Sequence, residues 1–592
     1  MLKDNRVVIL LVLTILMMGK LVLIKHLLSS ITFGPQILSD ELIYRIDAEK
    51  IFHGELFSTT HYPPLYPLLL SVAFFSKDHW YEWMMYINVL LSSLILIPVW
   101  LISLRFLPRA ASLAVVIIAA LSAFHIYYPR LIMSENLHVP LFSLSIFLLL
   151  NTDREAKMKG IINNTLFGVS MALGYLTKYL YLVAIPALIL LWWSKPFFND
   201  EHEKRRIIAA SRLVDFFAIC SGFILIYLPW LIYVYSSGVP VTQGMGTEFV
   251  RSGIPDYANW RSLALWITFY ISYSFLALAP YLLVFSLYLF MLLSGSIKND
   301  RQETFFLIIV VLLSAVFLAT GIQHSWRAGY NYPVPQKIMG RYVMHLMPLW
   351  LIVFMIALNK IKNAVHRLNL SHIIFCSLLC FASMFLALVI LMLIQDARGL
   401  EFYFANSPDV SVFMRMQPKP FVFFFFILFT IMAGILAAGR QNRLLSERFI
   451  LIFSLLLFLI QTGSSYTVLQ VLYRPADVEF HGRALSQFIR DELKTNDEKI
   501  TMISDEPEFH IQRLPASIAF WLTERKIEPP ITFISFKDYF SGDRRESDKV
   551  YTITKGYSGI PIYKYTAKEQ IYYIYDFESW LQGQRLPDKN SD

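Results

Sequence analysis

The sequence predicts a polytopic α-helical membrane protein with a small C-terminal α/β domain outside the membrane, and three observations carry this prediction. First, 56% of the 592 residues are apolar and only 16% are charged, whereas soluble domains are about a quarter charged. Second, long apolar runs recur through most of the chain without the alternation of barrel strands, so helices must satisfy the backbone. Third, the last part of the chain is polar and rich in charge.

The apolar runs give about 13 transmembrane helices, because roughly 20 apolar residues cross the hydrocarbon core as a helix. The first run has a basic start and lacks a small-residue cleavage site, so we expect an uncleaved span rather than a signal peptide. The predicted spans are 7–27, 82–104, 110–128, 137–150, 163–176, 179–193, 213–235, 270–293, 304–321, 342–359, 372–394, 419–438 and 448–468.

Basic residues gather in every second loop, and this indicates the orientation. With the N-terminus in the cytoplasm, every inside loop carries at least two lysines or arginines, whereas the outside loop 236–260 has only Arg251. We therefore expect a protein of the plasma or inner membrane whose first outer loop, 28–81, and tail are extracytoplasmic. The net charge of +9 comes largely from the inside loops. It therefore indicates contact with membrane lipids and no nucleic-acid partner.

The chain divides into two predicted domains, 1–469 and 470–592. The first domain holds all the spans. The second begins with a helical pattern, DVEFHGRALSQFIRDEL, and then has two short β-like runs, ITMIS and ITFISF. We expect a small α/β domain on the outer face.

The first outer loop contains an acidic helical stretch, SDELIYRIDAEKIFHG, that ends at Gly54. Asp40 and Tyr44 lie near one face of this helix. Acidic residues in a first helical turn are common in solvated helices, so a plain interfacial helix is the simpler interpretation. The next stretch, HYPPLYPLLLSVAFF, is too short to span and predicts a second interfacial or re-entrant helix. Two helices at the water–lipid boundary suit a substrate that is half lipid.

Further charged residues are predicted on the same side of the membrane. They are Arg130, Glu135, Lys178, Arg327, Lys337 and Arg341. Charged groups near membrane depth usually pair or take part in chemistry, because their burial is costly. Simpler roles stay open: Lys178 as a snorkelling anchor, Glu135 as a helix cap, and the last three as loop charges. Together, the cations suit a phosphate or pyrophosphate, and a carboxylate suits activation of a hydroxyl.

Five stretches together resemble the GT-C glycosyltransferases, the multi-spanning enzymes that use lipid-phosphate sugars. They occur in this order along the chain: SDELIYRIDAEKIFHG, HYPPLYPLLL, PRLIMSENLHVPLFSL, GYLTKYLYL and GRYVMHLMPLW. Within this class the chain is similar to glycosyltransferase family 39, which contains the protein O-mannosyltransferases and the lipid A aminoarabinose transferases. The resemblance implies a GT-C-like membrane domain.

The resemblance also implies roles for individual residues. Asp40 matches the general base in the first outer loop, with Glu41 as its neighbour and Glu135 as a second acid. The residues expected to bind the donor phosphate are Lys178, Arg341, Arg327 and Lys337. The residues expected beside the donor or acceptor are Tyr44, His61, Tyr62 and Arg130.

One position departs from part of this family. His61 and Tyr62 stand before the paired prolines, where the aminoarabinose transferases have an acid–lysine pair and the mannosyltransferases have a histidine. The acceptor is therefore left open among a glycan, a lipid and a protein. No cofactor is assigned, and a divalent metal ion is left open because family members differ in its use.

The expected reaction is transfer of a sugar from a polyprenyl-phosphate donor, dolichyl- or undecaprenyl-linked, to an acceptor hydroxyl with inversion at the anomeric carbon. Asp40 would deprotonate the hydroxyl, and the cations would stabilise the departing phosphate. Neither a Walker A loop nor a G-x-G-x-x-G motif occurs in the sequence. Two alternatives stay open: a ligase or polymerase of lipid-linked glycans, and a transporter or flippase of lipid-linked sugars.

Overall fold

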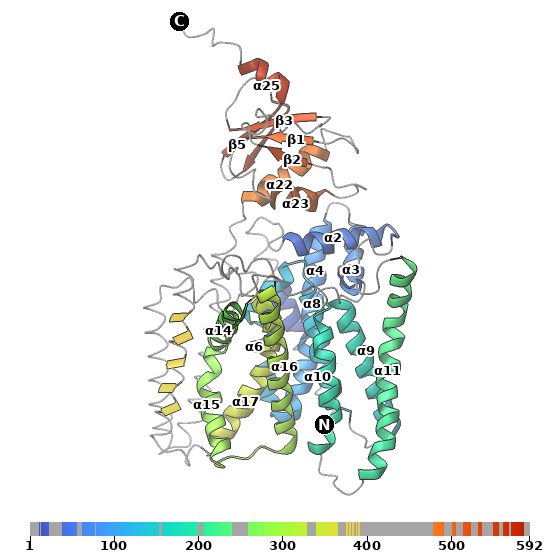
Figure 1. Ribbon diagram of the computed structural model, residues 1–592, viewed down its shortest axis with the longest axis vertical. Coiled ribbons are helices and arrows are strands. Elements are labelled where there is room, and N and C mark those ends of the chain that lie inside the picture. Colours follow the sequence, from blue (N-terminus) through green and yellow to red (C-terminus); the bar gives the residue numbers. More distant parts are fainter. Residues whose placement is uncertain are drawn as a thin grey trace.

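The protein is a bundle of membrane helices with a small mixed sheet beyond one end (Figure 1). The computed structural model describes the following residues: 11, 13–22, 38–55, 62–76, 79–152, 157–198, 205–238, 259–327, 339–364, ten positions between 375 and 390, 477–490, 500–504, 513–522, 531–534, 549–555, 561–567 and 570–584.

Five helices in these residues are long and apolar enough to cross a membrane, so the chain is an integral membrane protein. They are Trp80–Phe106, Tyr181–Phe198, Arg212–Ser236, Arg301–Arg327 and Gly340–Ile361. The predicted spans 419–438 and 448–468 lie outside the described residues, as do the ends of 7–27 and most of 372–394. The total of about 13 spans therefore stays a prediction.

Most other predicted spans correspond to observed helices. Predicted span 82–104 is α4 (Trp80–Ser93) followed by α5 (Leu96–Phe106). The remaining matches are α8 (Glu135–Leu150), α9 (Lys157–Thr177), α10 (Tyr181–Ser194), α11 (Arg205–Ser236), α16 (Arg301–Arg327) and α17 (Met347–Ala364).

Two predicted spans are broken, and these predictions were wrong as continuous helices. Span 110–128 consists of α6 (Arg109–Ala120) and α7 (Ala123–Tyr127), with a bend of 54° between the two arms. Ser122 has an extended backbone there, as residues before a helix commonly do. Span 270–293 consists of α14 (Trp260–Ala277) and α15 (Ala279–Leu293). Pro280 lies in the first turn of α15, where a missing N–H is tolerated. In the interior of one continuous helix the same proline would remove a hydrogen bond and clash with the preceding turn.

Helix α2 (Leu38–Phe52) lies across one end of the bundle instead of entering it (Figure 1). It ends where the sequence predicts, since Gly54 has a φ of 82° that L side chains rarely adopt. Helix α3 (Leu65–Leu70) and the 3₁₀ turn η1 (Ser71–Phe75) pack against α2. The stretch 65–75 is shorter than a span, in agreement with an interfacial or re-entrant helix.

Two glycines set the close packing of α9 against α11. A Cβ atom on Gly168 would lie 2.0 Å from the carbonyl oxygen of Ile219, and one on Gly222 would lie 2.2 Å from that of Thr165. Only glycine permits backbones this close. Helix α9 ends at Thr177, so its packing against α11 also fixes the position of the next residue, Lys178, along the bundle axis.

The described residues between 477 and 584 form a five-stranded sheet with three helices. The strand order is β2-β1-β3-β5-β4, where β1 is parallel to both its neighbours and β5 antiparallel to both of its own. The strands are β1 (Ile500–Ile503), β2 (Ile531–Ile534), β3 (Lys549–Thr554), β4 (Tyr563–Ala567) and β5 (Gln570–Asp576). The helices are α22 (Asp477–Phe488), α23 (Arg513–Trp521) and α25 (Phe577–Gln584). The predicted domain boundary at 469/470 lies outside the described residues.

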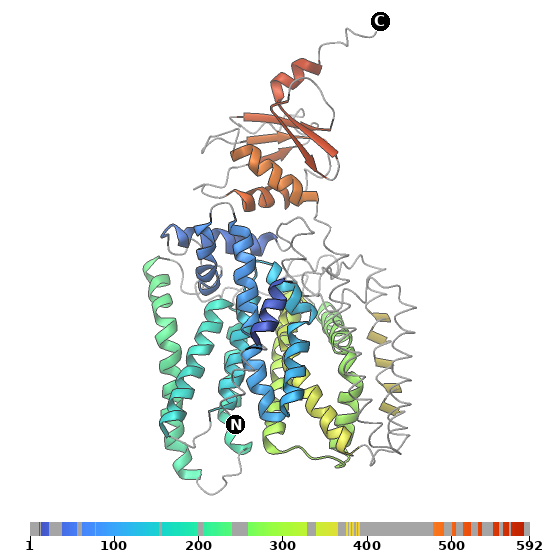
Figure 2. The same cartoon turned by 180° about the vertical axis from the view of Figure 1, so that it is seen from behind.

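Helices α22 and α23 lie on the side of the sheet that faces the bundle, and α25 lies on the far side (Figures 1 and 2). Helix α23 packs against α2. The acidic helix is therefore enclosed between the membrane bundle below and the C-terminal sheet with its helices above.

Candidate active site

Asp40 lies in the first turn of α2 and accepts two hydrogen bonds from distant parts of the chain. Arg341 donates through Nη1 at 2.8 Å, and the hydroxyl of Tyr62 donates at 3.1 Å. The Asp40 side chain is 17% exposed and that of Arg341 10%. Burial alone would raise the pKa of Asp40, but the charge and hydrogen bond of Arg341, the hydrogen bond of Tyr62 and the charge of Lys178 outweigh it and lower this pKa. Asp40 is therefore a carboxylate at neutral pH.

A second ion pair joins Glu135, the first residue of α8, to Lys178, which links α9 to α10. The ring of Tyr342 connects the two pairs, because the ammonium group of Lys178 lies 5.7 Å from its centroid and the guanidinium carbon of Arg341 lies 6.0 Å from it. The structure thus brings together four residues that the sequence predicts for one site: Asp40, Glu135, Lys178 and Arg341.

These pairs leave buried polar atoms unsatisfied. Within the described part of the chain, neither Nε of Arg341 nor Oε2 of Glu135 has a hydrogen-bond partner. Leaving such a group buried and unpaired costs about 1–3 kcal/mol, more when it is charged. The arginine therefore keeps a donor and the carboxylate an acceptor that no described residue uses.

Glu41 and Tyr44 face the bundle and hold α2 in place. Glu41 is fully buried, and its Oε2 accepts a hydrogen bond of 2.9 Å from the backbone N–H of Ile132. The Tyr44 hydroxyl donates to Oγ of Ser134 at 2.8 Å. These contacts tie α2 to the segment that leads into Glu135. The catalytic role that the sequence predicts for Glu41 stays a prediction.

Two of the other predicted site residues, Arg130 and Arg327, lie in segments that contact parts of the site, and two are not described. Arg130 is buried at the end of the 3₁₀ turn η2 (Tyr128–Arg130), immediately before the segment that Glu41 binds. Arg327 is the last residue of α16, which packs against η5 (Gly340–Tyr342), the turn that carries Arg341. His61 and Lys337 lie outside the described residues.

Sequence reasoning missed several residues that shape this site. The Tyr270 hydroxyl accepts a hydrogen bond of 3.1 Å from the backbone N–H of Met339 and so fixes the entry to η5. Asn88 accepts from the Tyr66 hydroxyl at 2.7 Å and donates to the carbonyl of Leu131 at 2.8 Å. Asn88 could have been found in the sequence, because it is an amide inside an apolar span. Tyr270 could not, because it is one of many tyrosines in this chain.

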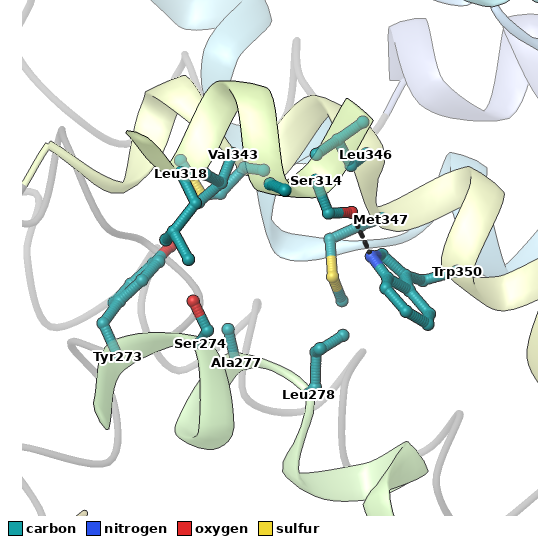
Figure 3. A pocket seen from close by; sticks show the side chains of 12 residues that line it. Tyr273, Ser274, Ala277, Leu278, Ser314, Leu318, Val343, Leu346, Met347 and Trp350 are labelled. Atoms are coloured by element: carbon teal, nitrogen blue, oxygen red, sulfur yellow. Dashed lines mark hydrogen bonds between the residues drawn. The ribbon is translucent and has the colours of Figure 1, made fainter. Parts of the chain in front are cut away.

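An apolar cavity of about 210 Å³ opens beside η5, between α14, α16 and α17 (Figure 3). Its wall begins at Val343, two residues after Arg341, and continues through the 3₁₀ turn η6 (Met344–Leu346) to Met347 and Trp350. Tyr273, Ala277 and Leu278 line the opposite side in Figure 3, and Leu318 of α16 lies beside Val343. Trp350 donates its Nε1 hydrogen to Oγ of Ser314 at 3.0 Å, so the indole edge is satisfied within the wall. The arginine and an apolar space are thus adjacent along the chain.

The acidic residues of the site do not form a metal centre with other ligands in the part of the chain that the structure describes. No group of three His, Cys, Asp or Glu side chains comes together there. His61 is not among these residues, so metal use stays open.

The fold of the chain is similar to that of a solved protein. No family model and no curated protein matches the sequence. ArnT from Cupriavidus metallidurans bound to undecaprenyl phosphate matches with a TM-score of 0.50 and 14% identity, over 95% of this chain and 97% of that one. ArnT, a lipid A aminoarabinose transferase, is a GT-C glycosyltransferase. The chain has a GT-C fold.

Two further structures are similar. ArnT in the apo state matches with a TM-score of 0.48 and 13% identity over the same shares of both chains. The Archaeoglobus fulgidus oligosaccharyltransferase in the apo form matches with a TM-score of 0.39 and 12% identity, over 64% of this chain and 55% of that chain. The GT-C fold implied by the five sequence stretches is thus confirmed by the first of these three structures.

Proposed function

We propose that this chain is a membrane glycosyltransferase that moves a sugar from a polyprenyl-phosphate donor to an acceptor hydroxyl at the end of the bundle covered by α2. The observation that carries the proposal is the Asp40–Arg341 pair, whose arginine lies two residues before Val343, a residue in the wall of an apolar cavity. A lipid-phosphate sugar has an apolar chain, an anionic phosphate and a reactive carbon in sequence. The cavity, the cations and the carboxylate offer one matching environment for each of these three parts.

The phosphate would bind Arg341 and Lys178. Both cations now pair with carboxylates, and the guanidinium group still has an unused Nε hydrogen. A planar guanidinium can hold two phosphate oxygens at once. Each charge-assisted hydrogen bond contributes about 1.5–3 kcal/mol, so the two cations together would account for much of the donor's affinity.

The lipid chain would enter the apolar cavity. The cavity wall includes Val343 and Met344, two and three residues after Arg341. We infer that one molecule places its phosphate on the arginine and its first isoprene units against these two residues. The GT-C fold shared with ArnT, whose structure was solved with undecaprenyl phosphate, supports this choice of donor.

Asp40 would act as the general base. Its carboxylate takes the proton of the acceptor hydroxyl, and the oxygen forms a bond to the anomeric carbon as the bond from that carbon to the phosphate oxygen breaks. The leaving phosphate keeps the electron pair, and the two cations neutralise it. One displacement inverts the anomeric configuration.

Donor binding would also activate this base. Arg341 contributes both charge and a hydrogen bond to the lowered pKa of Asp40. When the donor phosphate takes over Arg341, Asp40 loses much of this stabilisation and its pKa rises toward the range of a useful base. The carboxylate is thus most basic when a donor is present.

The test is sugar transfer by the purified protein in proteoliposomes. Undecaprenyl-phosphate-linked radiolabelled hexoses and pentoses serve as donors, and membrane extract supplies acceptors. We expect transfer with inversion by the wild type and almost none by a folded Asp40→Asn variant. Movement of the intact lipid-linked sugar across the membrane without transfer would instead indicate a flippase, and polymer formation would indicate a ligase or polymerase.

A further inference from the structure

Helix α23 of the C-terminal region has two faces that belong to two different hydrophobic cores. Leu514, Ile518 and Leu522 recur every four residues and pack into the core beneath the sheet. Phe520 and Trp521 lie at the end of the same helix but are buried in the core of the membrane bundle. One short helix therefore joins the two parts of the chain.

The contact is an aromatic cluster with the start of α4. The ring of Trp80 lies 5.7 Å from Phe520 and 5.9 Å from Trp521, and the ring of Tyr81 lies 5.8 Å and 5.3 Å from the same two residues. All four side chains are less than 10% exposed. Arg483 of α22 closes the cluster, with its guanidinium carbon 5.1 Å from the ring of Trp521.

The cluster continues to the far end of α2. Trp80 stacks on Phe74 at 5.6 Å, and Phe74 lies 6.1 Å from Phe52, the last residue of α2. Helix α23 also packs directly on α2. A 15-residue helix that does not enter the bundle is marginal on its own in water, so α2 depends on such packing for its position.

We propose that Phe520 and Trp521 are positioning residues for the transfer reaction: the C-terminal region clamps α2 from above and so holds Asp40 at the site. The bundle fixes α2 from below through Glu41 and Tyr44, and α23 closes the other side. The inference rests on the proposed function in assigning a reaction to Asp40. It gives the C-terminal region a role in catalysis without any contact with substrate.

The test compares Phe520→Ala/Trp521→Ala with Phe577→Ala. Phe577 is also a buried aromatic residue of the C-terminal region, but it stacks on Trp580 in α25, on the far side of the sheet. The readouts are kcat for sugar transfer, affinity for undecaprenyl phosphate, and amide hydrogen exchange of residues 40–52. In the double variant we expect exchange of α2 to become at least about tenfold faster and kcat to fall about 10- to 100-fold. Donor affinity should not fall, and Phe577→Ala should change neither quantity.

The combination of readouts separates positioning from general stability. The pair Phe520→Leu/Trp521→Phe keeps most of the apolar volume and should restore most of kcat; it also serves as the milder variant if the alanine pair does not fold. Exchange of α2 equal to that of the wild type, unchanged kcat, or a joint fall of kcat and donor affinity would each overturn the clamp. A wild-type protein that transfers no sugar would count against the proposed function, while the exchange of α2 would still decide whether α23 holds this helix.

Discussion

The two ends of the membrane bundle both hold a largely buried or half-buried ion pair between distant segments, but the pairs are built differently. At the end opposite α2, Lys360 pairs with Glu303 at 2.6 Å and also donates to the carbonyl of Lys298 at 3.2 Å. Glu303 in turn accepts from the N–H of Asp300 at 2.9 Å and donates its own N–H to that side chain at 2.6 Å. This is a reciprocal helix cap in which an ion pair also takes part.

At the α2 end the corresponding pairs are incomplete. Arg341 pairs with Asp40 and Lys178 with Glu135, yet a nitrogen of Arg341 and an oxygen of Glu135 stay unpaired within the described residues. Such atoms lower stability, and departures from good packing and pairing tend to occur at functional sites. The comparison teaches that the pairs of the proposed site differ from the pair at the opposite end by their unused hydrogen-bonding capacity.

The largest expected effect is the loss of transfer in Asp40→Asn. The amide keeps the shape of the side chain but cannot accept a proton, and removal of a general base costs about 10²–10⁴-fold in rate. Transfer by the folded variant is compared with Glu303→Gln, the same change at the opposite end, which should keep its turnover. Near wild-type turnover by Asp40→Asn would remove Asp40 from the mechanism.

Removal of a cation at the α2 end should weaken the donor instead. Lys178→Gln loses one charge-assisted contact to phosphate, of about 1.5–3 kcal/mol, so we expect affinity for undecaprenyl phosphate to fall roughly 10- to 150-fold. If Lys178 is only a snorkelling anchor, the variant will insert poorly or unfold at lower temperature but bind the lipid normally. Titration of the folded fraction distinguishes the two.

Replacement of Arg341 by lysine should have an intermediate effect. Lysine keeps the charge but not the planar fork that holds two oxygens. We expect Arg341→Lys to lose one hydrogen bond, of about 1 kcal/mol. Its affinity for undecaprenyl phosphate should therefore fall less than that of Arg341→Gln. Equal affinities in the two variants would show that the fork geometry is irrelevant.

The smallest effect is expected from Tyr62→Phe. The Tyr62 hydroxyl donates to the ionised form of Asp40, so its removal raises the pKa of Asp40 and moves the acid limb of transfer to higher pH. The same hydrogen bond affects stability. Because the folded-state pKa of Asp40 is lowered, this carboxylate stabilises the folded protein at a pH above its unfolded-state pKa of about 3.9. This stabilisation is lost as the pH falls from that value through the folded-state pKa. In Tyr62→Phe the folded-state pKa lies closer to the unfolded value, so the contribution of Asp40 to stability is smaller and its loss is complete at a higher pH. An unmoved acid limb in the pH profile of kcat would argue against the hydrogen bond in the working enzyme.

Much of this site could be predicted because its residues are charged within an apolar chain. Asp40 and Arg341 are 301 positions apart, and the orientation of the loops sufficed to place them on one side, but not to pair them. The different orientations of Asp40 and Glu41 depend on the roll of α2, which packing against Ile132 decides and local sequence does not. Pro280 was a visible signal for the break between α14 and α15. The prediction missed the break because the surrounding apolar run is long enough for one span.

The central claim is that the incomplete pairs at the α2 end bind a lipid phosphate, and one titration tests it most directly. Affinity for undecaprenyl phosphate is measured in nanodiscs for the wild type, Arg341→Gln and Lys360→Gln, all checked for folding by thermal denaturation. Both variants remove a cation from a buried or half-buried pair. The account predicts a fall of roughly 10- to 150-fold for Arg341→Gln and wild-type affinity for Lys360→Gln. Equal affinity in all three proteins would contradict it.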